Sequence, residues 1–138
     1  MALPEKIRLE IVTPERPLFS GDVERVTVPA KQGYLGILPG HAPLLAELGI
    51  GHIGYSAGGK SEVFSCCWGF VEVLPDRVVV LTQTAERASE IDSNRANQAK
   101  QRAERRLFSK DANLDFVRAE LALRRAISRL DAAGHHRR

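Results

Sequence analysis

The first part of the chain alternates hydrophobic and polar residues with a period of two. In the stretch KIRLEIVTP, the residues at 7, 9 and 11 are aliphatic and those at 8 and 10 are charged. Such alternation predicts a strand with one buried face. The stretch DVERVTVPA repeats the pattern through Val23, Val26 and Val28, although its register slips once.

Turn-forming residues interrupt these apolar runs at short intervals. The stretch GFVEVLPDRVVVLTQTA contains two apolar runs joined by Pro75-Asp76, which predicts a hairpin. In GYLGILPGHAPLLAELGIGHIGY, a glycine or proline appears every few residues. Short strands with frequent turns and no helical pattern between them predict an antiparallel sandwich or barrel.

The last third of the chain changes to a helical period. From Ser89 to Ser109 there is no glycine or proline, and Ala96, Ala99, Ala103 and Leu107 recur at helical spacing. These small side chains allow a partner helix to come close. The segment SKDAN, residues 109–113, predicts a turn.

A second helix is predicted from residue 113 or 114 to residue 132 or 133, with Asn113 as its N-cap. Its hydrophobic positions are Phe116, Ala119, Leu123, Ala126, Ile127 and Leu130. Two helices joined by a short loop form an antiparallel hairpin. Because two helices enclose only a small core, we expect the hairpin to rest on another surface.

Composition supports this division into two modules. The chain has 138 residues, of which 43% are apolar, so it is globular. Residues 1–88 contain 8 basic and 10 acidic side chains, whereas residues 89–138 contain 12 basic and 7 acidic ones. All prolines, and all glycines except Gly134, precede residue 88. We therefore predict a β module over residues 1–88 and a helical module over residues 89–138.

The chain lacks the marks of export or of a disulfide framework. No apolar run is long enough to span a bilayer, and the first residues resemble neither a signal nor a transit peptide. We expect the chain to stay in the compartment where it is made. Cys66 and Cys67 are adjacent, so we predict two reduced thiols on opposite faces of a strand, and no metal site.

The stretch GYSAGGKS, residues 54–61, fits the phosphate-loop pattern G-x-x-x-x-G-K-S of nucleotide hydrolases. In such a loop, Lys60 would contact phosphates and Ser61 a magnesium ion. A helix must follow, because its N-terminal amides bind the phosphate. The stretch EVFSCCWGFVEV follows instead and favours a strand. We therefore predict a two-residue hairpin turn at Gly58-Gly59.

Candidates for other chemistry are sparse. His41 would suit a general base, since its side chain titrates near neutral pH. No nucleophile or carboxylate lies beside it in the sequence, so we favour a turn at Pro39-Gly40 with His41 hydrogen-bonded inside the loop. The basic helical module is also compatible with nucleic acid. We interpret Phe108 and Phe116 as core residues, which leaves no aromatic side chains to stack on bases.

Three segments together resemble a known family. The stretches GYLGILPGHAPLLAELGIG, WGFVEVLPDRVVVLTQTAER and IDSNRA stand in the order and spacing of the epsilon subunit of F-type ATP synthases. The resemblance extends from Ile7 to Leu130. It implies an α+β protein, with an antiparallel β-sandwich of about ten strands followed by a C-terminal helix hairpin.

The resemblance also implies a place in a larger complex. A member of this family is a non-catalytic central-stalk subunit that joins the gamma subunit to the c-ring, near the alpha and beta subunits. It would lie peripherally on the cytoplasmic face of a bacterial membrane and require no cofactor. The expected interface residues are Gly36, Leu38, Pro39, Gly40, His41, Ala42 and Pro43.

Some bacterial members of the family bind ATP as a regulatory ligand through an Ile/Leu-Asp-x-x-Arg-Ala motif. Here the matching and supporting residues are Glu86, Ile91, Asp92, Arg95, Ala96, Arg102, Arg125 and Arg129. Arg125 and Arg129 are four residues apart, so they share one helical face, and arginine forks suit phosphate oxygens. The structural alternative is that Asp92 caps the helix and the arginines are solvated.

The helices of this family restrain ATP hydrolysis. By resemblance, the residues that would meet acidic segments of the catalytic head are Arg105, Arg106, Arg118, Arg124 and Arg125. We expect such contacts to depend on charge and to weaken as salt increases.

Overall fold

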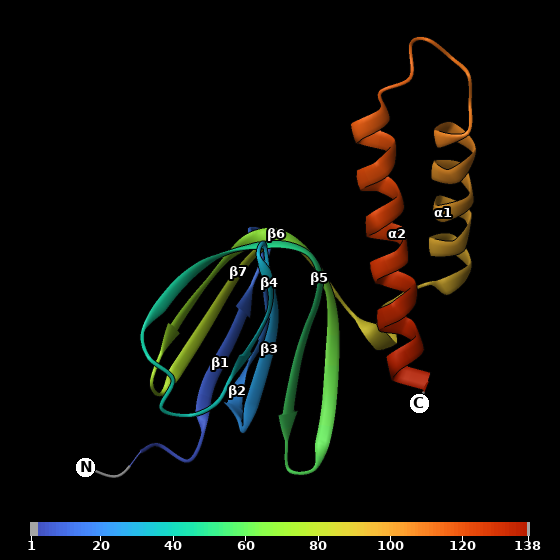
Figure 1. Cartoon of the computed structure of the whole chain (residues 1–138). Helices are drawn as coiled ribbons and strands as arrows, with labels where there is room; N and C mark the ends of the chain where they lie inside the picture. The colour runs from blue at the N-terminus through green and yellow to red at the C-terminus, as the bar shows by residue number, and fades with distance from the viewer. Residues whose placement is uncertain (1–2, 138) are drawn as a thin grey trace.

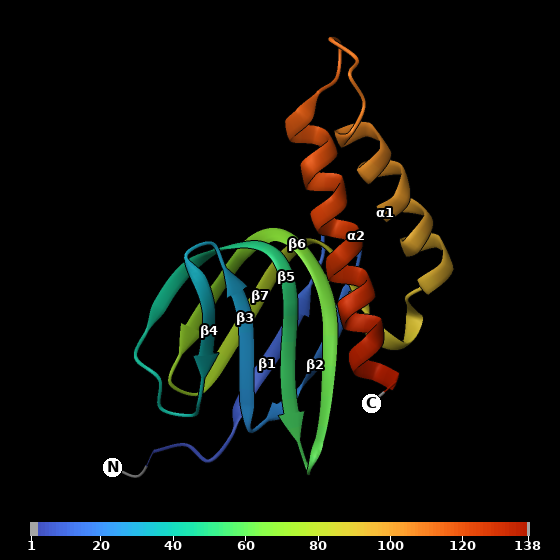
Figure 2. The ribbon, with the colours of Figure 1, turned by 45° about the vertical axis from the view of Figure 1, so that its right-hand side comes forward.

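A computed structural model describes residues 3–137, which form seven strands, a short 3-10 helix and two α-helices (Figure 1). The strands are β1 (Ile7–Val12), β2 (Pro17–Val23), β3 (Arg25–Ala30), β4 (Gly33–Ile37), β5 (Leu44–Ala57), β6 (Lys60–Leu74) and β7 (Arg77–Arg87). The helical elements are η1 (Ala88–Glu90), α1 (Ser93–Leu107) and α2 (Phe116–Arg137). In Figures 1 and 2, α2 lies between the sheet and α1. The predicted fold class, a β-sandwich followed by a helix hairpin, is confirmed.

The strands form one sheet in the order β2-β1-β7-β6-β5-β3-β4. Neighbouring strands are antiparallel except β1 and β7, which are parallel. The sheet curls so that β3, β4 and β5 lie opposite β1, β2 and β7 (Figure 2). One hydrophobic core fills the space between these layers, with buried side chains from every strand. This curled sheet is the predicted sandwich.

Near the middle of β6, the set of alternate side chains that points into the core changes, and this change is called the reversal below. Phe64 and Cys66 point into the core before the reversal, and Val71 and Val73 do so after it. Side chains alternate along a strand, so a change from even to odd core positions requires a local break in the geometry. The break is at Trp68 and Gly69, whose φ angles are +62° and +141°.

The neighbouring strands β5 and β7 show the same change of core-facing side chains at the same level of the sheet. In β5 the core positions change from Leu48 to Ile53, and in β7 they change from Val80 to Ala85. Each long strand therefore consists of two segments that face the core with opposite side-chain sets. This explains why the described residues contain seven strands where about ten were expected: β5, β6 and β7 each contribute to both layers.

The tight turn between β5 and β6 agrees with the sequence pattern. Gly58 and Gly59 have φ angles of +58° and +77° and connect Ala57 to Lys60, its cross-strand partner. Two consecutive positive φ angles favour glycine and close a two-residue hairpin. Because Lys60 is the first residue of β6, no helix follows the phosphate-loop pattern.

The two helices begin at aspartate caps. The Asp92 Oδ1 atom accepts a hydrogen bond from the Arg95 amide at 3.1 Å, and the Asp115 Oδ1 atom accepts one from the Arg118 amide at 3.0 Å. The predicted cap at Asn113 is therefore wrong, because the loop continues until Asp115 satisfies the first amides of α2. The helix α2 also continues through Gly134, beyond its predicted end.

The helices meet along a seam of small side chains. Ala96 and Ala103 of α1 are buried, as are Ala119 and Ala126 of α2. The sequence analysis interpreted the two aromatic residues at the far end of the hairpin as core residues. This prediction is wrong. Phe108 is 86% exposed and Phe116 is 58% exposed, because α1 ends at Leu107 and leaves no partner helix beside them.

The reversal in β6 generates a test of the fold. A Cβ atom at Gly69 would overlap the carbonyl oxygen of Leu81, and its φ of +141° disfavours any side chain. We expect Gly69→Ala to lower the free energy of unfolding by at least about 2 kcal/mol in urea titrations. Gly36→Ala, with open space at its Cβ position, serves as the control. Equal stability of the two variants would contradict this account of the reversal.

Candidate functional site

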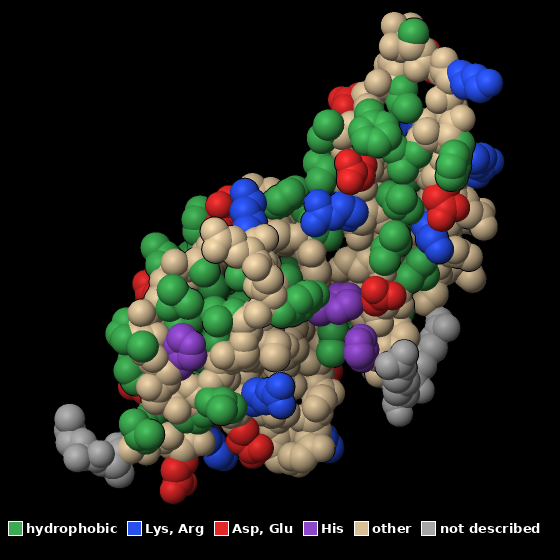
Figure 3. Space-filling model, viewed as in Figure 1, with side chains coloured by type: hydrophobic (Ala, Val, Ile, Leu, Met, Phe, Trp, Pro, Cys, Tyr) green, Lys and Arg blue, Asp and Glu red, His purple; other side chains and the backbone are tan. Residues whose placement is uncertain are grey.

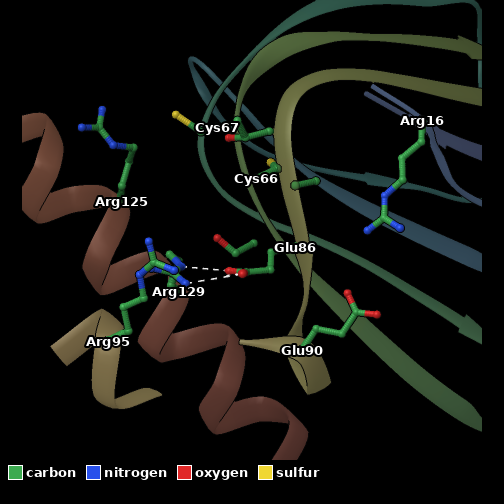
Figure 4. Close-up of a pocket in the computed structure, with 11 residues that line it drawn as sticks. Arg16, Cys66, Cys67, Glu86, Glu90, Arg95, Arg125 and Arg129 are labelled. Carbon is green, nitrogen blue, oxygen red and sulfur yellow. Dashed lines mark hydrogen bonds and ion pairs between the residues drawn. The ribbon is translucent and has the colours of Figure 1, made fainter. Parts of the chain in front are cut away.

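A cavity of about 580 Å³ lies between the sandwich and the helix hairpin (Figure 4). Its charged lining residues are Arg16, Glu86, Glu90, Arg95, Arg125 and Arg129. Arg95 comes from α1, Arg125 and Arg129 from α2, and Arg16 from the loop before β2. The cavity is thus bounded by parts of the chain that are far apart in sequence.

The lining carries more positive than negative charge. Glu86 and Arg129 form a bidentate ion pair, in which Nε donates to Oε1 at 2.9 Å and Nη2 donates to Oε2 at 3.4 Å. Among the described residues, no carboxylate forms an ion pair with Arg95 or Arg125. Arginine side chains with hydrogen-bond donors to spare attract anions, and phosphate oxygens match their geometry.

The structure brings together half of the residues predicted for nucleotide binding. Glu86, Arg95, Arg125 and Arg129 all line the cavity. Four other residues predicted for this site do not line it: Ile91, Asp92, Ala96 and Arg102.

Each of these four has a different position. Asp92 caps α1, as the structural alternative proposed. The Ile91 amide donates to the Ala88 carbonyl at 3.3 Å and closes η1. Ala96 is fully buried, and Arg102 is exposed about two turns beyond Arg95.

Sequence reasoning missed two charged residues of the lining. Arg16 and Glu90 approach from the side opposite the helix arginines (Figure 4). A turn positions Arg16, because the amide and the hydroxyl of Thr13 both donate to the Arg16 carbonyl, at 3.0 and 2.9 Å. No sequence motif marks Arg16, since its place depends on how the loop folds beside β7.

The two cysteines lie on opposite faces of β6, as predicted, and both are free thiols. Cys66 belongs to the sandwich core, where burial raises its pKa to about 12. Cys67 faces α2, and burial raises its pKa as well, although the nearby Arg125 opposes the shift. Both thiols are therefore protonated at neutral pH. In the described part of the chain, no group of His, Cys, Asp or Glu side chains is arranged to hold a metal.

The loop around His41 is held by local hydrogen bonds. The His41 amide donates to the Leu38 carbonyl at 3.1 Å, and Gly40 has a φ of +88°, so Pro39-Gly40 forms the predicted turn. The His41 Nδ1 atom lies 2.7 Å from the Ala42 carbonyl oxygen. The Gly40 amide donates to the Pro75 carbonyl at 2.8 Å, which ties this loop to the β6–β7 turn.

The fold defines a class of protein with a curled β-sandwich and a docked helix hairpin. Residues 6–88 match the beta-sandwich domain of the ATP synthase delta/epsilon chain, and residues 89–134 match its long alpha-helix domain. The chain therefore belongs to the delta/epsilon family of ATP synthase subunits. Among the described residues, no helix is long and apolar enough to cross a membrane.

Curated relatives and solved structures agree with this assignment. The chain is 50% identical over 125 residues to the ATP synthase epsilon chain of Bacillus cytotoxicus, covering 91% of this chain and 94% of that protein. It is 51% identical over 126 residues to the epsilon chain of Desulforamulus reducens, covering 91% and 96% respectively. A chain in the Euglena gracilis mitochondrial ATP synthase superposes with a TM-score of 0.84 at 26% identity, covering 98% of this chain and 85% of that one.

The thiols predict a pH dependence of stability. The pKa of Cys66 is about 12 in the folded chain and has an ordinary value of 9.0. The stabilisation from keeping this thiol neutral is complete below pH 9 and is lost as the pH rises toward 12. Urea titrations from pH 8 to 11 should therefore show a steeper loss of stability for the native chain than for Cys66→Ala. Parallel curves for the two proteins would contradict the shift.

Proposed function

We propose that this chain is the central-stalk epsilon subunit of a proton-translocating ATP synthase and that its helix hairpin restrains ATP hydrolysis under the control of bound ATP. The observation that carries the regulatory part is the cationic cavity. Its arginines come from α1, α2 and the sandwich, so an anion inside it would bridge elements that must separate if the hairpin opens.

The sandwich has a surface suited to assembly. Phe70 pairs with Leu81 across β6 and β7 and with Glu47 across β5 and β6, so their side chains share one face. Leu45 lies two residues before Glu47 and extends this face. Leu45, Phe70 and Leu81 are all more than half exposed, and hydrophobic side chains are visible over the sandwich in Figure 3. Exposed hydrophobic residues gathered on one face favour protein contacts.

We assign this face, together with the loop of residues 36–43, to contacts with the gamma subunit and the c-ring. Leu38 in that loop is 60% exposed, and Gly36, Ala42 and Pro43 are exposed as well. Such contacts would hold the subunit peripherally at the cytoplasmic face of a bacterial membrane. The similar Euglena chain comes from a complex described as OSCP/F1/c-ring, which supports this placement.

The arginines of the hairpin would act on the alpha and beta subunits. Arg106 and Arg118 both line a recess at the far end of the hairpin. The exposed Phe108 and Phe116 are each two residues from one of these arginines in the sequence. Arg105 precedes Arg106 in the same helix. If the helices extended, these three arginines and the two phenylalanines would reach the catalytic head first. Acidic segments there would be attracted by charge and then held by the aromatic residues.

Arg124 and Arg125 would add to these contacts only after the hairpin leaves the sandwich. In the docked hairpin, Arg124 borders a recess beside His52, and Arg125 lines the cavity.

The exposed phenylalanines also restore one feature of a nucleic-acid-binding protein. The family match over nearly the whole chain nevertheless favours the stalk.

ATP would hold the hairpin closed by joining its helices. Arg95 from α1 and Arg125 and Arg129 from α2 would neutralise the phosphates, and Glu86 would flank the ligand. Asp92 would act indirectly, by capping α1. A ligand shifts a conformational equilibrium only by its difference in affinity for the two states. ATP that contacts both helices at once meets this condition. Falling ATP would then release the helices to extend and to restrain hydrolysis.

The nucleotide site is tested by titrating the isolated full-length chain with ATP in a calorimeter. Arg95→Ala combined with Arg125→Ala should weaken ATP binding at least about tenfold, since hydrogen bonds to charged groups contribute roughly 1.5–3 kcal/mol each. Lys60→Ala is the control and should leave the affinity unchanged. Loss of binding with Lys60→Ala alone would place ATP at residues 54–61 and overturn the proposal.

The division of labour between the modules is tested by ending the chain at Ala88. We expect the truncated chain to assemble with the gamma subunit and to support ATP synthesis, because the exposed hydrophobic face lies wholly in the sandwich. Hydrolysis by the assembled enzyme should increase, because the restraining arginines are gone. A truncated chain that folds but does not join the gamma subunit would refute this division.

A further inference from the structure

We propose that two consecutive residues of α2, Ser128 and Arg129, latch the hairpin onto the sandwich without any ligand. The helix α2 is the docked element, because it contacts β5, β6 and η1, whereas the main contacts of α1 are with α2. The latch therefore controls whether the helix pair leaves the sheet. The nucleotide site shares Glu86 and Arg129 with the latch, and a bound anion would add a link to α1 through Arg95.

The sandwich side of the latch is a row of three residues across neighbouring strands. His52 on β5 pairs with Ser65 on β6, and Ser65 pairs with Glu86 on β7. Paired residues point to the same face of a sheet. Because Cys66 points into the core, Ser65 and its two partners point away from the core and toward α2. This row is called the latch row below.

Ser128 meets one end of the latch row. Its side chain is only 6% exposed, and its Oγ atom donates to the Gly51 carbonyl at 3.0 Å and lies 3.5 Å from Ser65 Oγ. The His52 Nε2–H group donates to the Ser128 backbone carbonyl at 2.8 Å. A serine inside a helix usually bonds to its own helix or to water, so a buried serine bonded to a strand marks a specific docking contact.

Arg129 meets the other end of the row through its bidentate pair with Glu86, drawn as dashed lines in Figure 4. A further contact lies two turns beyond Ser128, where the rings of His135 and His52 meet edge to face with centroids 5.9 Å apart. Figure 3 shows histidine side chains together at this junction of hairpin and sandwich. One side of α2 thus meets each member of the latch row.

Undocking of α2 has a built-in reporter. The thiol of Cys67 is 7% exposed, faces α2 and lies two residues from Ser65 on the same face of β6. Cys66 is buried in the sandwich core and would be exposed only if the sandwich itself unfolded. Reaction of one thiol therefore reports undocking, and reaction of both together reports unfolding.

The test follows the labelling of the full-length, ATP-free chain by iodoacetamide, with mass spectrometry counting the modified thiols. If docking is fast compared with labelling, the rate follows the undocked fraction. Ser128→Ala and Glu86→Gln should each speed labelling of Cys67 about fivefold to tenfold, in line with the net contribution of one hydrogen bond or more. Ser61→Ala and Lys110→Gln, at exposed positions that make none of the latch contacts, should leave the rate unchanged.

Two results would overturn the latch. Labelling of Cys67 at the native rate in both latch variants would show that these contacts do not hold α2. Simultaneous labelling of Cys66 and Cys67 would show that they stabilise the whole sandwich instead of the docked state.

The consequence of the latch for hydrolysis rests on the proposed function, but the docking does not. Arg95→Ala should therefore weaken ATP binding and leave the ATP-free labelling rate unchanged. An absence of ATP binding in every variant would refute the nucleotide site alone. A faster ATP-free rate with Arg95→Ala would refute the assignment of the latch to α2 alone.

Discussion

The reversal of facing in β5, β6 and β7 determines where every other surface of the molecule can lie. Before the reversal in β6, Ser65 and Cys67 face outward, and after it Val71 and Val73 face the core. A strand of fifteen residues that kept one alternation would bury the wrong side chains over half its length. The break at Trp68 and Gly69 lets one strand serve both layers, and it leaves a polar outer row on which α2 can dock.

Much of the fold follows from local patterns in the sequence. The alternation at residues 7–11 and the turns at Pro75-Asp76 and Gly58-Gly59 report directly on the backbone. The slip in register between Val23 and Val26 has a simple cause, because β2 ends at Val23 and β3 begins at Arg25. The reversal was not predictable, since tryptophan does not ordinarily mark a positive φ angle.

The candidate site was only partly predictable for a different reason. The spacing of Arg125 and Arg129 fixes them on one helical face, and the resemblance to a family adds Arg95. The positions of Arg16, His52 and Ser128 depend on strand register and on docking between modules, which no local pattern encodes. Phe108 has the composition of a core residue, but its exposure is decided by where the partner helix ends.

The alanine seam gives the two modules different responses to temperature. The buried residues of the described helices are alanines and one serine, whereas the sandwich buries large aliphatic residues. Heat capacity changes in proportion to the apolar area exposed. Opening the hairpin would expose less apolar area than unfolding the sandwich, so the enthalpy of opening would vary less with temperature than the enthalpy of unfolding. The sandwich would have the curved stability profile of an ordinary domain, whereas the free energy of hairpin opening would change almost linearly with temperature.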